Sequence, residues 1–121
     1  MLQVEQKHQP FCKQFDISMQ RYWERYPDNK QSDIYKPVGL SKQTFSKIRS
    51  NNNPNYRPKK KNVLLVAIGL HLNAVQAEAL LASAGYVFDE KSKVEMTIKK
   101  FLEQRDFNMQ RIEESISENV E

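Results

Sequence analysis

Residues 63–70 read Val-Leu-Leu-Val-Ala-Ile-Gly-Leu, a run without a single polar side chain. A helix that is apolar on every side must lie inside the protein, so this segment is expected to be a central buried helix. Elsewhere the apolar positions recur every three or four residues, which is the spacing of helices that bury one face. The chain has only three glycines and almost no β-branched alternation. We therefore predict one all-α domain with a single core.

Two helices are expected before residue 40. The first covers roughly residues 10–25, because Phe11, Phe15, Met19 and Tyr22 share one face. Pro27 cannot continue that helix. A short second helix over residues 31–35 is limited by Pro37.

The third helix is predicted over about residues 42–49. Gly39 is a turn residue before it, and Ser41 is a good N-cap. Phe45 and Ile48 are three residues apart and face the core, which leaves the polar side chains on the outer faces. Residues 50–58 hold four asparagines and two prolines, a composition typical of a loop.

Capping signals predict the remaining helices. Pro58 suits the start of the fourth helix, where its missing N–H costs nothing. Asn73 with Gln76 forms a capping box for the fifth helix, and Gly85 stops that helix. Its expected inner face is Ala77, Leu80, Leu81 and Ala84.

The last part of the chain contains two further helices. Ser92 with Glu95 is a second capping-box signature, before a sixth helix marked by Val94, Ile98, Phe101 and Leu102. A final helix over about 108–117 carries Met109, Ile112 and Ile116 on one side. We predict a polar tail over 1–9, a main domain over 10–86 and a helical extension over 87–121.

Acidic residues are absent between Asp33 and Glu78, and this window carries the whole excess of positive charge in a chain of net charge +4. Its cations are Lys36, Lys42, Lys47, Arg49, Arg57, Lys59, Lys60 and Lys61. Charge of one sign favours a polyanionic partner, since each cation that neutralises a phosphate releases condensed counterions. A solvated lysine face is the simpler interpretation, but here the window coincides with a short helix, a turn and a second helix.

Residues 31–70 resemble the helix-turn-helix of the lambda-repressor-like (Xre-type) DNA-binding domains. The matching residues are Gln31, Gly39, Leu40, Ser41, Phe45, Ile48, Pro58, Val66, Ala67 and Leu70. The resemblance covers about 50 residues if the fifth helix is included, and the run Phe45–Ser50 is similar to a signature of some small bacterial regulators. It implies a five-helix domain, to which the two last helices add a C-terminal extension, and a role as a DNA-binding transcriptional repressor. Tyr35, Pro37 and Arg49 depart from the family pattern, which puts the geometry of the second helix in question.

The third helix is the expected reader of DNA, because an α-helix fits the major groove and its first turn meets base edges. The predicted base-reading residues are Lys42, Gln43, Ser46 and Lys47. Lysine suits guanine O6 and N7, and glutamine suits adenine N6 and N7. The resemblance implies that Gln31 holds a phosphate. The other predicted phosphate contacts are Ser41, Arg49, Asn52, Tyr56, Arg57, Lys59, Lys60 and Lys61.

An enzyme is not expected. Cys12 and His71 have no third partner that would orient a catalytic dyad, and with His8 they lack the spacing of zinc ligands. No cofactor or metal is predicted. The polar start, the absence of a long apolar run and the single cysteine indicate a cytoplasmic protein without a membrane span.

Three alternatives remain open at this point. The fold could serve a protein-interaction or antitoxin-like adaptor, for which Tyr35, Pro37 and the acidic tail argue mildly. Duplex RNA could replace DNA. The C-terminal helices could mediate a homodimer, since paired recognition helices reach half-sites one DNA turn apart.

Overall fold

The computed structural model describes residues 11–51 and 56–119, so the predicted tail lies outside the described residues. Within these ranges the chain forms helices and no strand, which confirms the all-α prediction. The helices are α1 (Phe11–Arg25), α2 (Ser32–Tyr35), α3 (Lys42–Ser50), α4 (Lys60–Gly69), α5 (Ala74–Ser83), α6 (Lys93–Glu103) and α7 (Met109–Asn119). None of them is both long enough and apolar enough to cross a bilayer.

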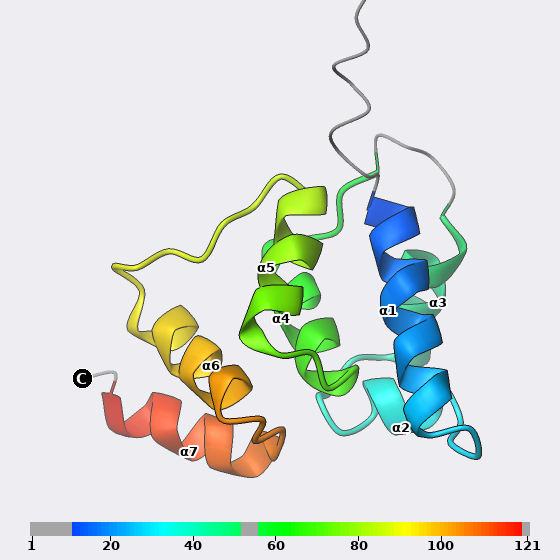
Figure 1. Cartoon of the computed structure of the whole chain (residues 1–121). Coiled ribbons are helices and arrows are strands. Elements are labelled where there is room, and N and C mark those ends of the chain that lie inside the picture. Colours follow the sequence, from blue (N-terminus) through cyan, green and yellow to red (C-terminus); the bar gives the residue numbers. More distant parts are fainter. Residues whose placement is uncertain (1–10, 52–55, 120–121) are drawn as a thin grey trace, which may run out of the picture.

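The pair α4 and α5 forms the centre of the protein, with α1, α2 and α3 on one side and α6 and α7 on the other (Figure 1). On the first side, α1 contacts α5 and α3, while α2 contacts α4 and α3. On the other side, α6 packs against α5 and α7 packs against α6. The short helix α2 is therefore held between the central helix and α3.

The central position of α4 follows from its apolar surface. Val63, Val66 and Ala67 are fully buried, and Ile68 is almost so. Only Leu65 in this run is half-buried. The expectation that residues 63–70 form a central buried helix is confirmed.

The predicted caps of α5 are both present. The Asn73 side chain accepts the N–H of Gln76 at 2.8 Å, and the Gln76 side chain accepts the N–H of Asn73 at 3.0 Å. At the other end Gly85 has φ +87, a left-handed conformation that glycine adopts without strain. The N–H groups of Gly85 and Tyr86 then return to the carbonyls of Ala82 and Leu81, each at 2.9 Å.

Two other helices end in the same way without glycine. His71 has φ +58 after α4, and Arg105 has φ +57 after α6. The next residue donates its N–H back to the helix in both cases, from Leu72 to Ala67 at 3.1 Å and from Asp106 to Phe101 at 2.9 Å. Neither of these helix ends has a glycine, so neither could be predicted from a glycine C-cap.

The predicted start of α4 at Pro58 is wrong by two residues. Lys59 is the extended N-cap and Lys60 is the first helical residue. Pro58 is buried in the preceding segment, where its carbonyl accepts the hydroxyl of Tyr86 at 2.9 Å. That tertiary hydrogen bond holds Pro58 outside the helix.

The helices α6 and α7 each contribute apolar residues to the core. Ile98, Phe101, Leu102 and Ile112 all belong to the core. Val94, in contrast, is 37% exposed. It lies in the first turn of α6, before the helix meets the rest of the core.

Candidate nucleic-acid interface

The start of α3 is fixed by the cap predicted for Ser41. Ser41 is extended (φ −77, ψ 157), and its Oγ accepts the N–H of Thr44 at 3.0 Å. The Ser41 hydroxyl also donates a hydrogen bond to the Thr44 hydroxyl at 2.9 Å. Since the Ser41 side chain is engaged in the cap, its main contribution to a site on α3 is to place the first turn.

Aromatic packing holds the inner face of α3. Phe45 and Ile48 are 1% and 2% exposed, as their spacing predicted. The ring of Phe45 contacts Phe15 of α1 edge-on, with centroids 5.9 Å apart, and Tyr35 of α2 at 5.3 Å. Tyr35 thus fills the space between α2 and α3, and contacts with α1 and α2 fix the orientation of α3.

The outer face of α3 carries the four predicted base-reading residues, all of them exposed: Lys42, Gln43, Ser46 and Lys47. Arg49 is exposed in the last turn. Within the described part of the chain, none of these side chains takes part in an ion pair or donates a hydrogen bond. Their charges are therefore available to a partner, although Lys47 and Arg49 also suit the negative C-terminal end of α3.

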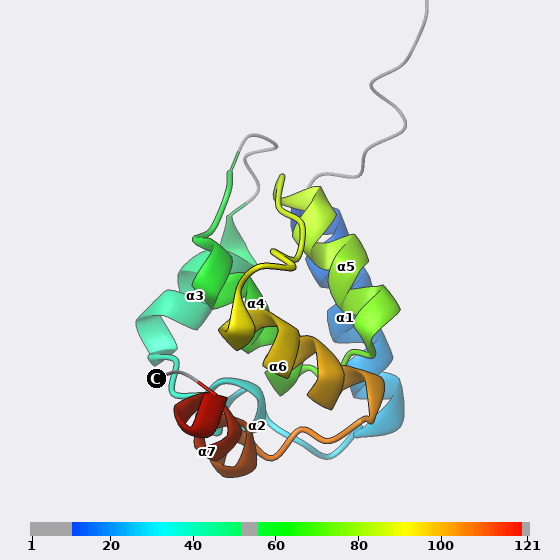
Figure 2. The same ribbon diagram turned by 90° about the vertical axis from the view of Figure 1, so that its left-hand side faces the viewer.

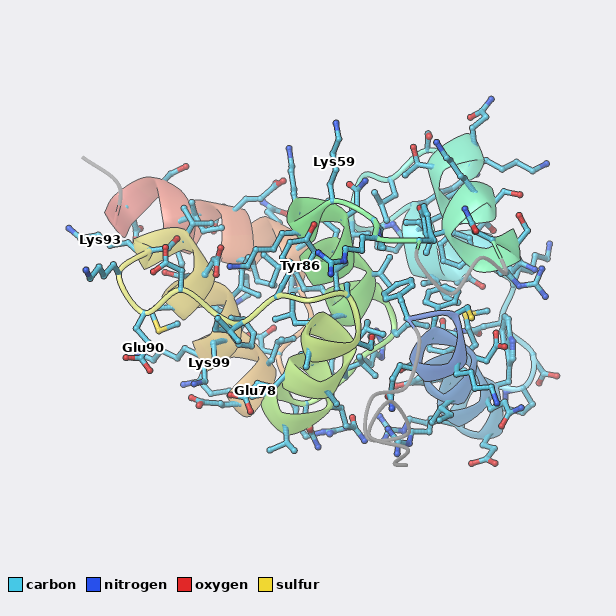
Figure 3. All side chains as sticks on the ribbon, turned by 90° about the horizontal axis from the view of Figure 1, so that it is seen from above. Lys59, Glu78, Tyr86, Glu90, Lys93 and Lys99 are labelled. Carbon is cyan, nitrogen blue, oxygen red and sulfur yellow. The ribbon has the colours of Figure 1, made fainter. Side chains whose placement is uncertain are left out.

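The three lysines at the start of α4 have different surroundings. Lys59 and Lys61 are exposed, and neither forms an ion pair with another described residue. In Figure 3 the side chain of Lys59 projects from the same edge of the molecule as α3. The first turn of α4 has no acidic residue and no side-chain cap, so its N–H groups favour an anion.

Lys60 forms an ion pair with Glu95, a residue that the sequence predicted to complete the capping box of α6. Its Nζ lies 2.8 Å from Oε1 of Glu95 in α6, with both side chains mostly buried. The same oxygen accepts the N–H of Asp89 at 2.7 Å. The capping box predicted from Ser92 and Glu95 is therefore only half formed: Ser92 accepts the N–H of Glu95 at 3.1 Å, but Glu95 turns toward Lys60.

The loop residues predicted to meet phosphates differ in their surroundings, and Tyr56 packs against the core. Tyr56 is half-buried, and its ring contacts Phe11 edge-on with centroids 6.4 Å apart. Burial raises the pKa of the Tyr56 hydroxyl above its ordinary value. Arg57 is exposed, and a Cβ added at Gly85 would lie 3.2 Å from its guanidinium carbon. The predicted contact Asn52 lies outside the described residues.

Gln31 is half-buried directly before α2 and makes no side-chain cap. Asp33, two residues later, accepts the N–H of Lys30 at 2.8 Å and brings a negative charge to this end of α2. A carboxylate here disfavours a second anion. The surroundings of Gln31 are thus less suited to a phosphate than those of Lys59 and Lys61.

His71 is occupied by contacts within the core. Its Nδ1 lies 3.0 Å from the Tyr26 hydroxyl, and its ring stacks on Phe107 with centroids 4.5 Å apart. Burial, then the charges of Arg25 and Arg105, lower the pKa of His71. Cys12 is half-buried in α1. Among the residues that the structure covers, no three potential metal ligands come together.

No protein-family model matches the sequence, and neither a curated protein nor a solved structure gives a significant match to it.

Proposed function

We propose that the protein is a sequence-specific regulator of transcription, which binds double-stranded DNA through α3 and represses by occupying its operator. The observation that carries the proposal is the outer face of α3, where Lys42, Gln43, Ser46 and Lys47 are exposed on a helix whose start and orientation are fixed. A helix held in this way can enter the major groove as a rigid body. The short α2, the turn at Gly39 and α3 follow one another as in a lambda-repressor-like helix-turn-helix.

The side chains divide into two groups by the kind of contact that their chemistry permits. Lys42 and Gln43, in the first turn, suit the edges of guanine and adenine. Arg49, Lys59 and Lys61 suit phosphates, which position the protein without reading sequence. We leave Lys60 out of the phosphate group, because the pair with Glu95 would have to break first.

The main alternative is an adaptor that uses the same surface for a protein partner. The absence of acidic residues between Asp33 and Glu78 favours DNA, because a protein partner would not require charge of one sign over this length. The two functions differ in their salt dependence. Phosphate contacts give a slope of log affinity against log salt of about −0.9 for each phosphate neutralised in duplex DNA.

The test is the binding of a duplex DNA pool at several salt concentrations by the wild-type protein and two double variants. We expect a steep negative slope for wild type and a flatter one for Lys42→Ala with Lys47→Ala. The matched control, Lys91→Ala with Lys100→Ala, removes two exposed lysines outside the acid-free window and should leave the slope unchanged. A shallow wild-type slope, or stronger competition by duplex RNA than by DNA, would reject the proposal.

One argument for the expected homodimer was the apolar surface of the C-terminal helices. That argument is weaker now, because Ile98, Phe101 and Ile112 are buried within a single chain. The geometric reason for a dimer remains, since two recognition helices can occupy half-sites one DNA turn apart. We therefore expect a monomer in free solution and two copies on a duplex with two half-sites. Sedimentation with one-site and two-site duplexes measures this directly.

A further inference from the structure

A groove of about 340 Å³ lies between α4, α6 and α7. In Figure 2 the helices α6 and α7 face the viewer, with α4 behind them. The apolar part of its lining comes from all three helices: Leu64, Leu65, Val94, Ile98, Met109 and Ile116. This volume is within the range of small-molecule sites, which are mostly apolar with a few polar groups.

The inner part of the apolar lining is buried, and its outer part is accessible to solvent. Leu64 and Ile98 are buried core residues, whereas Leu65, Met109 and Ile116 are only half-buried. The half-buried group includes residues of α4 and α7, on both walls of the groove. An apolar body placed between them would remove from water the surface that the fold itself leaves accessible.

The polar groups of the groove gather at the end formed by the start of α4 and the start of α6. Lys61 is exposed there and forms no ion pair with another described residue. Ser92 uses its oxygen to accept the N–H of Glu95, which leaves its O–H to donate. Glu95 is itself neutralised by Lys60. This end therefore offers a free ammonium and a hydroxyl donor.

The carboxylate of Glu113 lies on the α7 wall of the groove. It lies on α7 between Met109 and Ile116 and is exposed. No described cation pairs with it, so it disfavours an anion along the α7 side of the groove. A ligand with one negative end would thus be oriented, with that end at α4.

We propose that this groove binds a small carboxylic acid with an apolar body. The hydrocarbon lies between Leu65, Met109 and Ile116, and the carboxylate accepts hydrogen bonds from Lys61 and Ser92. Lys61 is also one of the cations proposed to meet DNA phosphates, so a bound acid would weaken duplex binding. That consequence rests on the proposed function, whereas binding of the acid does not.

The direct test is calorimetric titration of the DNA-free protein with octanoate, octan-1-ol and octylammonium. We expect saturable binding of one octanoate, and at least tenfold weaker binding of the other two. Lys61→Ala should weaken octanoate about tenfold, the loss of a charge-assisted hydrogen bond, and leave octan-1-ol unchanged. Lys91→Ala is the matched control, because Lys91 is exposed but does not line the groove.

A second pair of variants tests the apolar wall. Ile116→Glu should abolish octanoate binding, while Val75→Glu, on the exposed face of α5, should not change it. Equal affinity for octanoate and octan-1-ol would overturn the assignment of a carboxylate. Octanoate binding that survives Ile116→Glu would overturn the site. A dimer in free solution that Ile116→Glu dissociates would show that a second copy occupies the groove instead. Octanoate binding without effect on a DNA complex would overturn only the regulatory consequence.

Discussion

The carbonyl group of Ile34, at the end of α2, lies directly against the backbone of Gly69 in α4. A Cβ added at Gly69 would collide with the carbonyl oxygen and would lie 3.2 Å from the Ile34 carbonyl carbon and from its Cγ2. Gly69 has an ordinary φ, so backbone conformation does not require a glycine here. The lack of space for a Cβ does. The contact sets how closely α2 approaches the central helix, and through Tyr35 and Phe45 it contributes to the position of α3.

Gly69→Ala should therefore lower the free energy of unfolding, by about 1–3 kcal/mol from overpacking. The sign is informative, because replacing glycine by alanine within a helix normally stabilises it by about 1 kcal/mol. Denaturant titration of both proteins measures the difference. Ala82→Gly, on the exposed face of α5, gives the helix-propensity contribution in the same protein. A more stable Gly69→Ala variant would contradict the close approach of α2 and α4.

The lysines at the start of α4 should not be equivalent. Lys59→Ala and Lys61→Ala should each reduce the steepness of the salt dependence of DNA binding by about 1, the value of one lost phosphate contact. Lys60→Ala should leave that slope unchanged and lower stability by about 1 kcal/mol, since it removes the partner of Glu95. Salt-titrated binding and denaturation of the three single variants decide between them. If the three variants had the same slope, whether equal to that of wild type or not, the distinction between Lys60 and the other two lysines would be wrong.

His71 should make stability depend on pH near neutrality. Its pKa in the folded protein is lower than its ordinary value of 6.5, mainly because of burial and then because of Arg25 and Arg105. The unfolded chain therefore takes up the proton first as the pH falls. The stability present above about pH 6.5 is lost progressively on acidification, until the pH passes the lower, folded pKa.

The measurement is denaturant unfolding at about pH 7.5 and about pH 5.5, on either side of the ordinary histidine pKa. His71→Asn is the suitable variant, because asparagine tolerates the left-handed conformation at this position. The variant should be less stable at the higher pH, through loss of the ring contacts, and should lose less stability between the two. His8 is present in both proteins and does not affect the comparison. An unchanged pH dependence would rule out His71 as its source.

The parts of the fold that depend on local chemistry could be predicted from the sequence. Ser41 and Asn73 cap their helices as expected, and Phe45 and Ile48 face the core because their spacing fixes the face. Contacts between distant segments could not be predicted in this way. Glu95 fits a cap by its position, yet its carboxylate pairs with Lys60 at 2.8 Å, and only the packing of α6 beside α4 decides between the two.

The candidate site shows the same division. The exposed face of α3 follows from helical periodicity, whereas the asparagines and prolines before α4 predict a loop without showing which of its side chains pack on the core. Tyr56 packs on Phe11, since an aromatic ring gains more from burial than from solvent. The stop of α4 at His71 has no glycine to mark it, although the end of the apolar run at Leu70 predicts the end of the helix.

The reading of bases by α3 can be tested at single positions. Lys42 and Gln43 are exposed in the first turn, directly after the Ser41 cap, and neither contributes to the core. Gln43→Ala should relax the preference at one base pair, an A·T pair in our assignment, and leave fold and non-specific affinity intact. A bidentate base contact contributes about 1–3 kcal/mol of discrimination, while a phosphate contact contributes affinity alone.

Lys42→Ala should relax a G·C preference and also lower affinity for all sequences, because it removes a charge. Selection from a randomised duplex library, with wild type and both variants in parallel, separates these effects. Lys91→Ala, which changes the net charge equally but lies far from α3 in sequence, is the control for Lys42→Ala and should select the wild-type site. If wild type, Gln43→Ala and Lys42→Ala all select the same sequence, α3 does not read bases, and DNA binding by this protein would need another surface.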